Sequence, residues 1–360
     1  MPLRAFIENH EVVAPLVGDE EWDRLRRVIR TKAATLRMAC CDNGGHLRIS
    51  KLGTKHFVHA GVPNCNWAPE TVNHLRAKQD IVVACQRAGF VAQPEVSGTD
   101  WRADVLATKG NVKIAFEVQW SGQTEEETRL RNGRYENAGV RCCWFMRKPP
   151  EALVRTPTKA LPVFRLLVAE DKLLYVEMRE KLWPLNDFTQ SLLNRHIQYR
   201  ASATIDSTQR VTVVFFGISC WKCGHSSHIY YLEEEYRTRC GIPASSVEGL
   251  EGEHDGEFAP EVVAAVQAFL MGAEGSGLHV GEIKQRFSRT VGRAYPSFGC
   301  PKCDAIFGDH FRIEDSLHAR YDQESAPAIL SVEVTCSRNV SAPHPHWCCP
   351  TSGEFCDARE

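Results

Sequence analysis

The sequence predicts an α/β protein in which a central block of helix, three strands, helix and strand follows a small mixed module and precedes a β-rich domain. Three observations carry this prediction: the hydrophobic patterns of residues 67–150, the change of texture after Pro149-Pro150, and two C-x2-C pairs beyond residue 200. A chain of 360 residues can hold one core of ordinary size and one or two smaller modules.

These patterns divide the chain into five segments. We predict an N-terminal mixed α+β module (1–66), the central block (67–150), a hairpin-helix extension of that block (151–204), a zinc-ribbon-like domain with an insertion (205–335), and a tail that contains Cys and His (336–360).

Composition and charge limit the function classes. With 43% hydrophobic and 24% charged residues the chain resembles a soluble globular protein, and no apolar run reaches the roughly 20 residues of a spanning helix. The N-terminus lacks the grading of a secretory signal, so we expect a cytoplasmic protein whose fifteen cysteines ligate metal or lie buried as thiols.

A formal net charge of −2 provides no overall attraction to nucleic acid, so any nucleic-acid site must be local. Two basic runs are candidates. One contains Arg129, Arg131 and Arg134, and the other extends from Arg24 to Arg37. The longer run is equally consistent with a solvated helix face.

The elements of the N-terminal module follow from turn and capping signals. We predict a hairpin over 4–16, a helix from Asp19 to about Arg37 with acidic residues in its first turn, and two more strands before residue 60. Proline and asparagine at 63–66 mark the end of the module.

The central block opens with a helix from about Pro69-Glu70 to Gly89. Strands follow at 90–96, 101–108 and 112–120, then a helix at 123–138 and a strand at 140–146. Beyond it we predict a hairpin at 163–178, a helix at 184–196, a strand-rich unit from residue 201 and a helix at 260–271. The last 35 or so residues are poor in helix or strand signals.

The hairpin of the central block carries the most informative polar residues. Gly110-Asn111 is a good two-residue turn, and this turn places Asp104 directly opposite Glu117, with Cβ atoms about 5 Å apart. Two such carboxylates repel unless a cation lies between them. Asp104, Glu117 and Gln119 should share one face and suit Mg²⁺, although a surface strand pair with scattered charge is the alternative.

The preceding helix carries Glu70, His74 and Lys78 at i, i+4 and i+8, which places them in one polar stripe. This stripe could supply a further carboxylate and proton-handling groups to the hairpin. Taken alone, the stripe is better explained as a solvent-facing row.

The order and spacing of these elements resemble the competence protein CoiA-like nuclease family of the PD-(D/E)xK superfamily. The segment His56-Phe57-Val58-His59 is similar to the N-terminal module of that family. The matching elements of the core are Glu70-x3-His74-x3-Lys78, Glu95, Arg102-Ala103-Asp104-Val105, Glu117-Val118-Gln119-x-Ser121, Arg129, Tyr135 and Trp144.

The resemblance implies a restriction-endonuclease-like fold and the hydrolysis of DNA phosphodiester bonds. RNA is not excluded as a substrate. Asp104 and Glu117 are expected to hold Mg²⁺ or Mn²⁺, Glu70 to add a carboxylate, and Glu95 to be a weaker candidate for that role. Gln119 stands where many members have lysine. The residues expected to contact nucleic acid are Arg102, Arg129, Arg134 and Tyr135.

Glutamine can orient water or phosphate, but it carries no positive charge and cannot act as a general base. Lys78 could approach the site from the helix instead. Two other functions therefore stay open: a non-catalytic nucleic-acid-binding accessory in recombination or competence, and an antiviral defence effector that depends on a protein partner.

The paired cysteines predict a structural zinc site. Two C-x2-C knuckles supply the four thiolates of a tetrahedral site: Cys220, Cys223, Cys300 and Cys303. Because the gap between the pairs is long, separate sites completed by His225, His228, Cys240 or His310 are the alternative.

Two other groups of cysteines are expected to be less informative. Cys40, Cys41, His59 and Cys65 could form an eroded zinc finger, but adjacent cysteines are poor co-ligands, so buried thiols are favoured. For the tail, a flexible thiol-bearing end is favoured over a metal site formed from Cys336, His344, His346, Cys348, Cys349 and Cys356.

Overall fold

The computed structural model describes residues 2–61, 65, 70–179, 181–232, 237–248, 250, 256–308, 312–317, 330–350 and 354–356. The chain forms two compact units, Met1–Tyr199 with Pro345–Cys349, and Arg200–His344 with Pro350–Glu360. Each unit is described by itself. Pro69, the expected start of the first core helix, lies outside the described residues.

A seven-stranded mixed sheet forms the centre of the first unit. Its strand order is β12-β11-β10-β9-β8-β7-β6, with parallel pairing of β8 with β9 and of β9 with β10 and antiparallel pairing elsewhere. The strands are β6 (Val91–Ser97), β7 (Arg102–Lys109), β8 (Val112–Gln119), β9 (Arg141–Met146), β10 (Val163–Val168), β11 (Leu174–Met178) and β12 (Lys181–Pro184).

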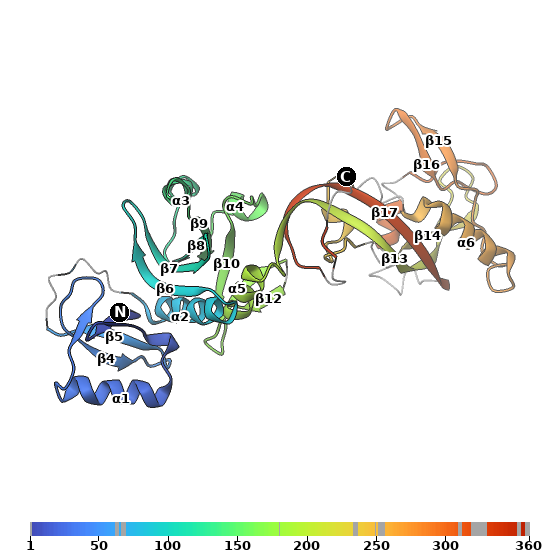
Figure 1. Ribbon diagram of the computed structural model, residues 1–360. Coiled ribbons are helices and arrows are strands. Elements are labelled where there is room, and N and C mark those ends of the chain that lie inside the picture. The colour runs from blue at the N-terminus through green and yellow to red at the C-terminus, as the bar shows by residue number, and fades with distance from the viewer. Residues whose placement is uncertain are drawn as a thin grey trace. The chain divides into compact units, whose positions relative to one another are not determined.

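Helices cover both faces of this sheet (Figure 1). On one face lie α2 (Val72–Arg87) and α5 (Leu185–Leu193), which share a core with Phe116 and Phe145. On the other lie α3 (Glu125–Asn137) and α4 (Glu151–Arg155), which pack over Trp144. The order α2, β6, β7, β8, α3, β9 is the one predicted for the central block.

Side-chain caps fix where the two core helices begin. The Thr71 hydroxyl accepts a 3.1 Å hydrogen bond from the backbone N–H of His74, and Thr124 caps α3 in the same way through Glu127. Three glutamates in the first turn of α3 suit the positive end of its dipole.

The N-terminal module packs around Trp22 and Phe57, whose ring centroids lie 5.3 Å apart. Its elements are β1 (Arg4–Ile7), β2 (His10–Val13), η1 (Ala14–Leu16), α1 (Asp19–Arg30), β3 (Leu36–Met38), β4 (Gly45–Ile49) and β5 (Lys55–His59). They make a sheet of order β2-β1-β3 and a β4-β5 hairpin.

The prediction that the first helix continues to about Arg37 is wrong. Helix α1 ends at Arg30, Lys32 adopts a left-handed conformation with φ 59°, and Leu36 pairs with Ile7 in the sheet. The helical pattern of the sequence reflects only local preferences. The pairing of β3 with β1 joins residues far apart in the chain, and it outweighs the helical preference of residues 36–38.

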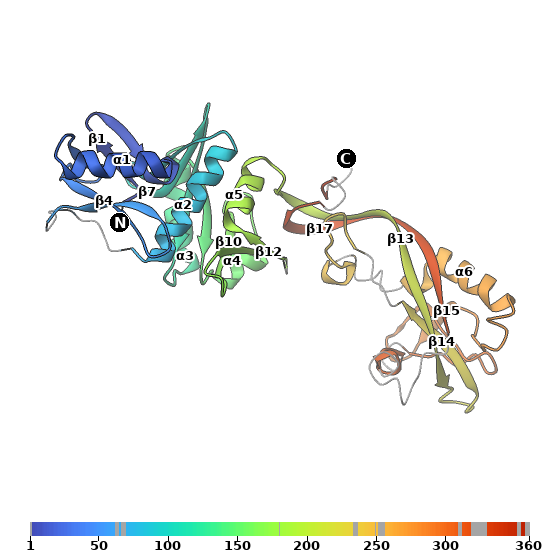
Figure 2. The same cartoon turned by 90° about the horizontal axis from the view of Figure 1, so that it is seen from below.

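The second unit contains a three-stranded sheet of order β14-β13-β17, and its two long strands run side by side in Figure 2. Its elements are β13 (Gln198–Ser219), β14 (Ser226–Leu232), η2 (Ala244–Ser246), α6 (Pro260–Met271), the hairpin β15 (Lys284–Ser288) and β16 (Arg293–Ser297), and β17 (Leu330–Cys348).

The expectation of little regular structure in the last 35 residues is therefore wrong for 330–348. Pro343 and Pro345 weaken the strand signal there, but proline is tolerated in an edge strand, and β17 is at the edge of its sheet. Among the residues that the structure describes, no helix has both the length and the apolar character that crossing a membrane requires.

Candidate active site

Helix α2 presents the predicted polar stripe to the sheet. Lys78 is completely buried, and its Nζ lies 2.8 Å from Glu70 Oε1 and 2.8 Å from Glu95 Oε1. His74 Nε2 lies 3.1 Å from Asp104 Oδ2. The stripe therefore faces the acids of the sheet, which favours the site over the solvent-facing row.

Strand β7 changes its alternation at Asp104. The β7–β8 pairing is regular from Lys109↔Val112 to Val105↔Phe116, as the turn predicted. Val105 and Ala107 belong to the core under α2, whereas Leu106 and also Ala103 belong to the core under α3. Regular alternation would place Ala103 on the same face of the sheet as Val105. The side chains before and after Asp104 therefore alternate in opposite phase.

The neighbouring strand β6 is distorted at the same level. Glu95 has φ 60°, a left-handed conformation that is uncommon for a residue with a side chain, between the regular pairs Pro94↔Val105 and Val96↔Ala103. The N-terminal module holds this residue, because the backbone N–H of Leu3 donates to both Glu95 carboxylate oxygens, at 2.9 and 3.1 Å. Strained backbone of this kind is common at functional sites.

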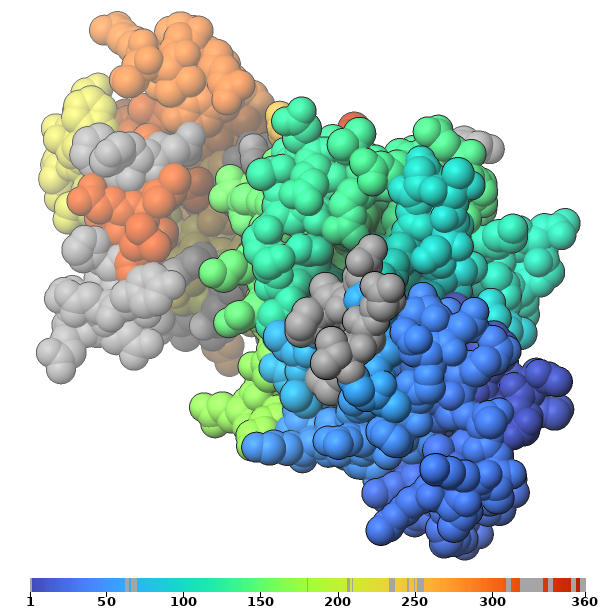
Figure 3. All heavy atoms as spheres, turned by 90° about the vertical axis from the view of Figure 1, so that its left-hand side faces the viewer, coloured from blue at the N-terminus to red at the C-terminus, as the bar shows by residue number. Residues whose placement is uncertain are grey.

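The N-terminal module therefore contributes directly to the site. Arg4 Nη2 also donates to the main-chain carbonyl of Glu95 at 3.2 Å. Figure 3 shows the module lying against the core of the first unit, with no separation between them in this view.

Glu117 points toward helix α3. Its carboxyl group accepts a 2.7 Å hydrogen bond from Arg131 Nη2 and also contacts the Tyr135 hydroxyl. The Asp104 carboxylate accepts the backbone N–H of Val118 at 2.9 Å instead of standing in a regular ladder opposite Glu117. The hairpin prediction is thus correct for the turn and for the register from Lys109↔Val112 to Val105↔Phe116. The predicted direct pairing of Asp104 with Glu117 is not part of this ladder.

The two acids of the hairpin have opposite pKa shifts. Burial and the nearby charge of Asp104 raise the pKa of Glu117 to about 8, although Arg131 and Tyr135 oppose the rise. Burial also disfavours the charged form of Asp104, but the hydrogen bond and charge of His74 and the charge of Lys78 outweigh burial, so the pKa of Asp104 lies below its ordinary value.

The Tyr135 hydroxyl can accommodate Glu117 in either protonation state. The Tyr135 hydroxyl lies 2.7 Å from the carbonyl oxygen of Arg102 and also contacts Glu117, but it has one proton to donate. If Glu117 is protonated, it donates to Tyr135, and Tyr135 donates to Arg102. With the pKa of Glu117 raised to about 8 and that of Asp104 lowered, one ionised and one neutral hairpin acid are favoured near neutral pH.

The charge of the buried lysine is fixed by its neighbours. Burial favours its neutral form, but Glu95, Asp104 and Glu70 outweigh burial and raise the pKa of Lys78 above its ordinary value. The pKa of Glu95 is raised, because burial dominates over the attraction of Lys78.

Gln119 lies at the open end of β8. Its amide Nε2 donates to Ser121 Oγ at 2.9 Å, and its Oε1 accepts from Arg131 Nη1 at 3.3 Å. Arg131 also lies 4.7 Å from the centre of the Trp144 ring. No specific role for Arg131 follows from the sequence alone. Its i, i+4 spacing to Tyr135 on α3 was the available signal.

The residues expected to contact nucleic acid do not all lie together. One pocket of about 440 Å³ is lined by Arg102, Arg134 and Tyr135, and Arg131 also lines it. Arg129 is not among the residues that line it, and it forms an exposed ion pair with Glu125.

The longer basic run, from Arg24 to Arg37, is partly neutralised. Arg24 pairs with Glu21, and Arg26 pairs with Asp23, both in exposed positions. Other members of the run line a surface hollow of about 550 Å³.

One group of acid and histidine residues has the spacing of cation ligands. The donor atoms of Glu70, His74 and Asp104 all lie within 4.8 Å of one another, and Glu117 does not belong to this group. Two carboxylates and an imidazole suit Mn²⁺ better than Mg²⁺, which prefers oxygen ligands.

The second unit brings the two cysteine knuckles together. The Sγ atoms of Cys220 and Cys303 lie 3.6 Å apart, those of Cys223 and Cys300 lie 3.7 Å apart, and all four lie within 4.8 Å of one another. These are the sulfur separations that a tetrahedron with metal–sulfur bonds of about 2.3 Å requires. The cluster is consistent with structural zinc.

The expected flexible end is not what the structure shows at Cys356. This cysteine is buried, and its Sγ lies 3.6 Å from that of Cys240 within the second unit.

These observations define a mixed α/β domain with acids converging between a helix and a distorted hairpin. Residues 70–211 match the family model described as competence protein CoiA, nuclease-like domain. This match confirms, for this part of the chain, the resemblance seen in the sequence. No curated protein matches the chain.

Proposed function

We propose that the protein is a metal-dependent nuclease with a restriction-endonuclease-like core that hydrolyses DNA phosphodiester bonds. The observation that carries the proposal is the convergence of Glu70, His74 and Asp104 within 4.8 Å beside the buried Lys78, in a segment that matches a nuclease-like family.

The residues present fit a divalent cation. Asp104 is ionised, Glu70 adds a second carboxylate, and Glu117 can join them once it loses its proton. A bound Mg²⁺ or Mn²⁺ would polarise the phosphate and lower the pKa of a bound water. Gln119, at the end of the strand that carries Glu117, would orient that water.

Contact with the substrate backbone is proposed for the arginines of the pocket beside α3. Arg102 and Arg134 line that pocket, and guanidinium groups bind phosphate in a bidentate manner. Arg131 is held by Glu117 and Trp144. We assign it to the positioning of Glu117.

The test is cleavage of single-stranded, double-stranded and branched DNA, and of RNA, in Mg²⁺ or Mn²⁺. We expect Asp104→Asn and Glu70→Gln each to lower cleavage by at least a hundredfold, and Glu126→Gln, an exposed carboxylate of α3, to leave cleavage unchanged. Full cleavage by both site variants would refute the assignment.

Retained DNA binding without cleavage by the wild-type protein would instead support the rival function, a non-catalytic nucleic-acid-binding accessory. The contact of Arg131 with Glu117 favours this rival, because it occupies an acid that the nuclease needs. In either case we place the protein in DNA processing or antiviral defence, with a protein partner to be sought by co-purification.

For the second unit we propose a zinc-ribbon-like module with Zn²⁺ held by Cys220, Cys223, Cys300 and Cys303. Its role would be structural, because a small strand module gains stability from a metal where its core is small.

A further inference from the structure

The turn that carries Cys40 and Cys41 has the backbone of a zinc knuckle. In the knuckle of Cys220, the N–H of Cys220 donates to the carbonyl of His225, and the N–H of Gly224 donates to the carbonyl of Cys220. Gly224 has φ 69°. The knuckle of Cys300 repeats both hydrogen bonds, at Ala305 and Asp304, with φ 58° at Asp304.

The same two hydrogen bonds occur in the N-terminal module. The N–H of Met38 donates to the carbonyl of Asn43 at 2.8 Å, the N–H of Asp42 donates to the carbonyl of Met38 at 3.0 Å, and Asp42 has φ 58°. Met38 thus takes the place of the first knuckle cysteine, and Cys41 takes the place of the second.

Met38 is completely buried in the core of the module, where its Sδ packs so closely on Gly45 that a Cβ there would lie 2.6 Å from it. It is therefore a core residue. Cys40, two positions later in the turn, provides the thiol that Met38 does not. A neighbouring pair of cysteines can share one site because the turn directs both side chains to it.

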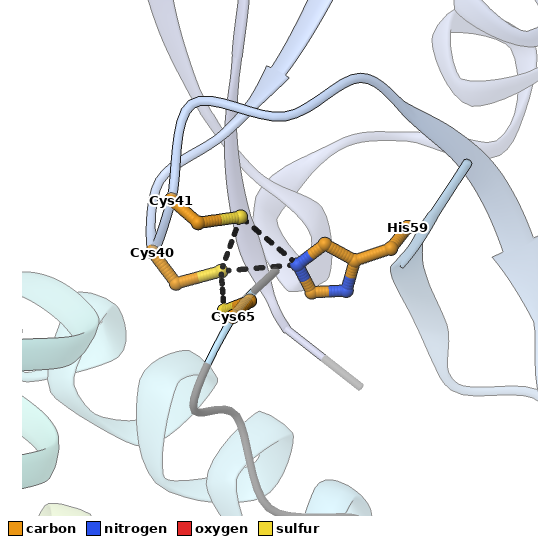
Figure 4. A group of neighbouring side chains, drawn as sticks. All are labelled: Cys40, Cys41, His59 and Cys65. Atoms are coloured by element: carbon orange, nitrogen blue, oxygen red, sulfur yellow. Dashed lines mark hydrogen bonds between the residues drawn. The ribbon is translucent and has the colours of Figure 1, made fainter. Parts of the chain in front are cut away.

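Four donor atoms meet at this turn (Figure 4). His59 Nε2 lies 3.4 Å from the Sγ of Cys40 and 3.2 Å from that of Cys41. The Sγ of Cys40 also lies 3.7 Å from those of Cys41 and Cys65. A zinc tetrahedron with Zn–S of about 2.3 Å and Zn–N of about 2.0 Å has edges of roughly 3.5–3.8 Å.

The burial of these residues separates a metal site from ordinary core thiols. Cys40 is exposed and Cys41 and Cys65 are half-buried, whereas Cys85 in the core of the first unit is completely buried. The expectation of buried thiols is therefore wrong for this group. The amide of Asn43 also donates to Cys41 Sγ at 3.3 Å, and a hydrogen bond of this kind orients a thiolate that binds metal.

We propose that Cys40, Cys41, His59 and Cys65 bind one Zn²⁺ in the N-terminal module, and that this metal fixes the start of the chain segment that leads to the active-site acid Glu70.

The second part of this inference rests on the proposed nuclease function. Cys65 precedes Glu70 by only a few residues, and Glu70 lies next to the buried Lys78. Binding of Cys65 to a metal on the N-terminal module would restrict where this segment can place the Glu70 carboxylate. The module would then support the site at two points, through the metal and through the bond from Leu3 to Glu95.

The experiment is metal analysis of the full chain, purified without chelator. We expect Cys65→Ser and His59→Gln each to lose one Zn²⁺ per chain relative to the wild-type protein. His46→Gln, on the exposed side of the same hairpin, is the matched control and should lose none. Cys65→His should keep the metal and shift the visible absorption of the Co²⁺-substituted protein to that of a site with fewer thiolates.

Unchanged zinc content in both Cys65→Ser and His59→Gln would overturn the metal site, whether or not the protein cleaves DNA. Mn²⁺ titration tests the second part separately. Cys65→Ser should weaken Mn²⁺ binding several-fold, whereas Glu70→Gln should weaken Mn²⁺ binding and keep the full zinc content. Unchanged Mn²⁺ affinity in Cys65→Ser would overturn the link to Glu70 and leave the zinc site standing.

Discussion

Replacing Glu117 by glutamine should change how the stability of the protein depends on pH. Burial and the charge of Asp104 raise the pKa of Glu117 in the folded protein to about 8, from its ordinary value of 4.5. Because the folded state binds this proton more tightly than the unfolded state, the contribution of Glu117 to the free energy of unfolding falls as pH rises from 4.5 to about 8.

The size of this effect follows from the same interval. Each pH unit across it corresponds to about 1.4 kcal/mol, so complete ionisation costs up to roughly 5 kcal/mol. That is a large part of the 5–15 kcal/mol by which a typical domain is stable. Glutamine has no proton to lose, so Glu117→Gln should be close to the wild-type protein near pH 5 and more stable by a few kcal/mol near pH 8.5.

The assay is urea unfolding in EDTA at a series of pH values, with the difference between variant and wild type plotted against pH. Other titrating groups contribute to both proteins and largely cancel in this difference. Glu136→Gln, an exposed carboxylate on the same helix α3, is the control and should show a flat difference. A flat difference for Glu117→Gln as well would refute a protonated Glu117.

The same proton should compete with the metal. If Mn²⁺ binds the ionised form of Glu117, its affinity for the wild-type protein should rise about tenfold per pH unit below pH 8. Isothermal titration should then show proton release. If Asp104 is the only hairpin ligand, the affinity should depend only weakly on pH. Lys78→Met should destabilise the fold by about 3–5 kcal/mol in chemical denaturation, because it leaves buried carboxylates uncompensated, and adding Glu95→Gln should recover part of that loss. Cys300→Ser should release zinc and speed hydrogen exchange in the second unit, while exchange in β6–β9 stays at the wild-type rate.

The sequence was sufficient for the parts of the fold that depend on short-range patterns. Gly110-Asn111 fixed the hairpin and its register as far as Val105, and the capping residue Thr71 lies at the start of a helix whose stripe was visible in the sequence. These features depend on residues within one or two turns of one another, which is the range over which propensity and periodicity are informative.

The features that the sequence could not reveal all depend on contacts between distant segments. Leu3 of the N-terminal module holds Glu95 in its left-handed conformation. The Arg131 guanidinium lies over the ring of Trp144, which belongs to the next strand. The turn of Cys40 was misjudged for a related reason. The donor atoms that meet there come from a turn, a strand and a later segment, and a rule about adjacent cysteines ignores the backbone that directs their side chains.

Lys78 is not suited to act as a general base. A general base must be neutral near the working pH, but three surrounding carboxylates raise the pKa of Lys78, so it stays cationic. It is also fully buried and held by Glu70 and Glu95, so it is not available to take a proton from water. Its charge instead allows these acids to lie close to Asp104 before any metal binds. Under the proposed nuclease function, a bound metal would therefore have to activate the attacking water, with Gln119 only orienting it. Such a reaction would depend more on metal binding than one with a lysine on β8.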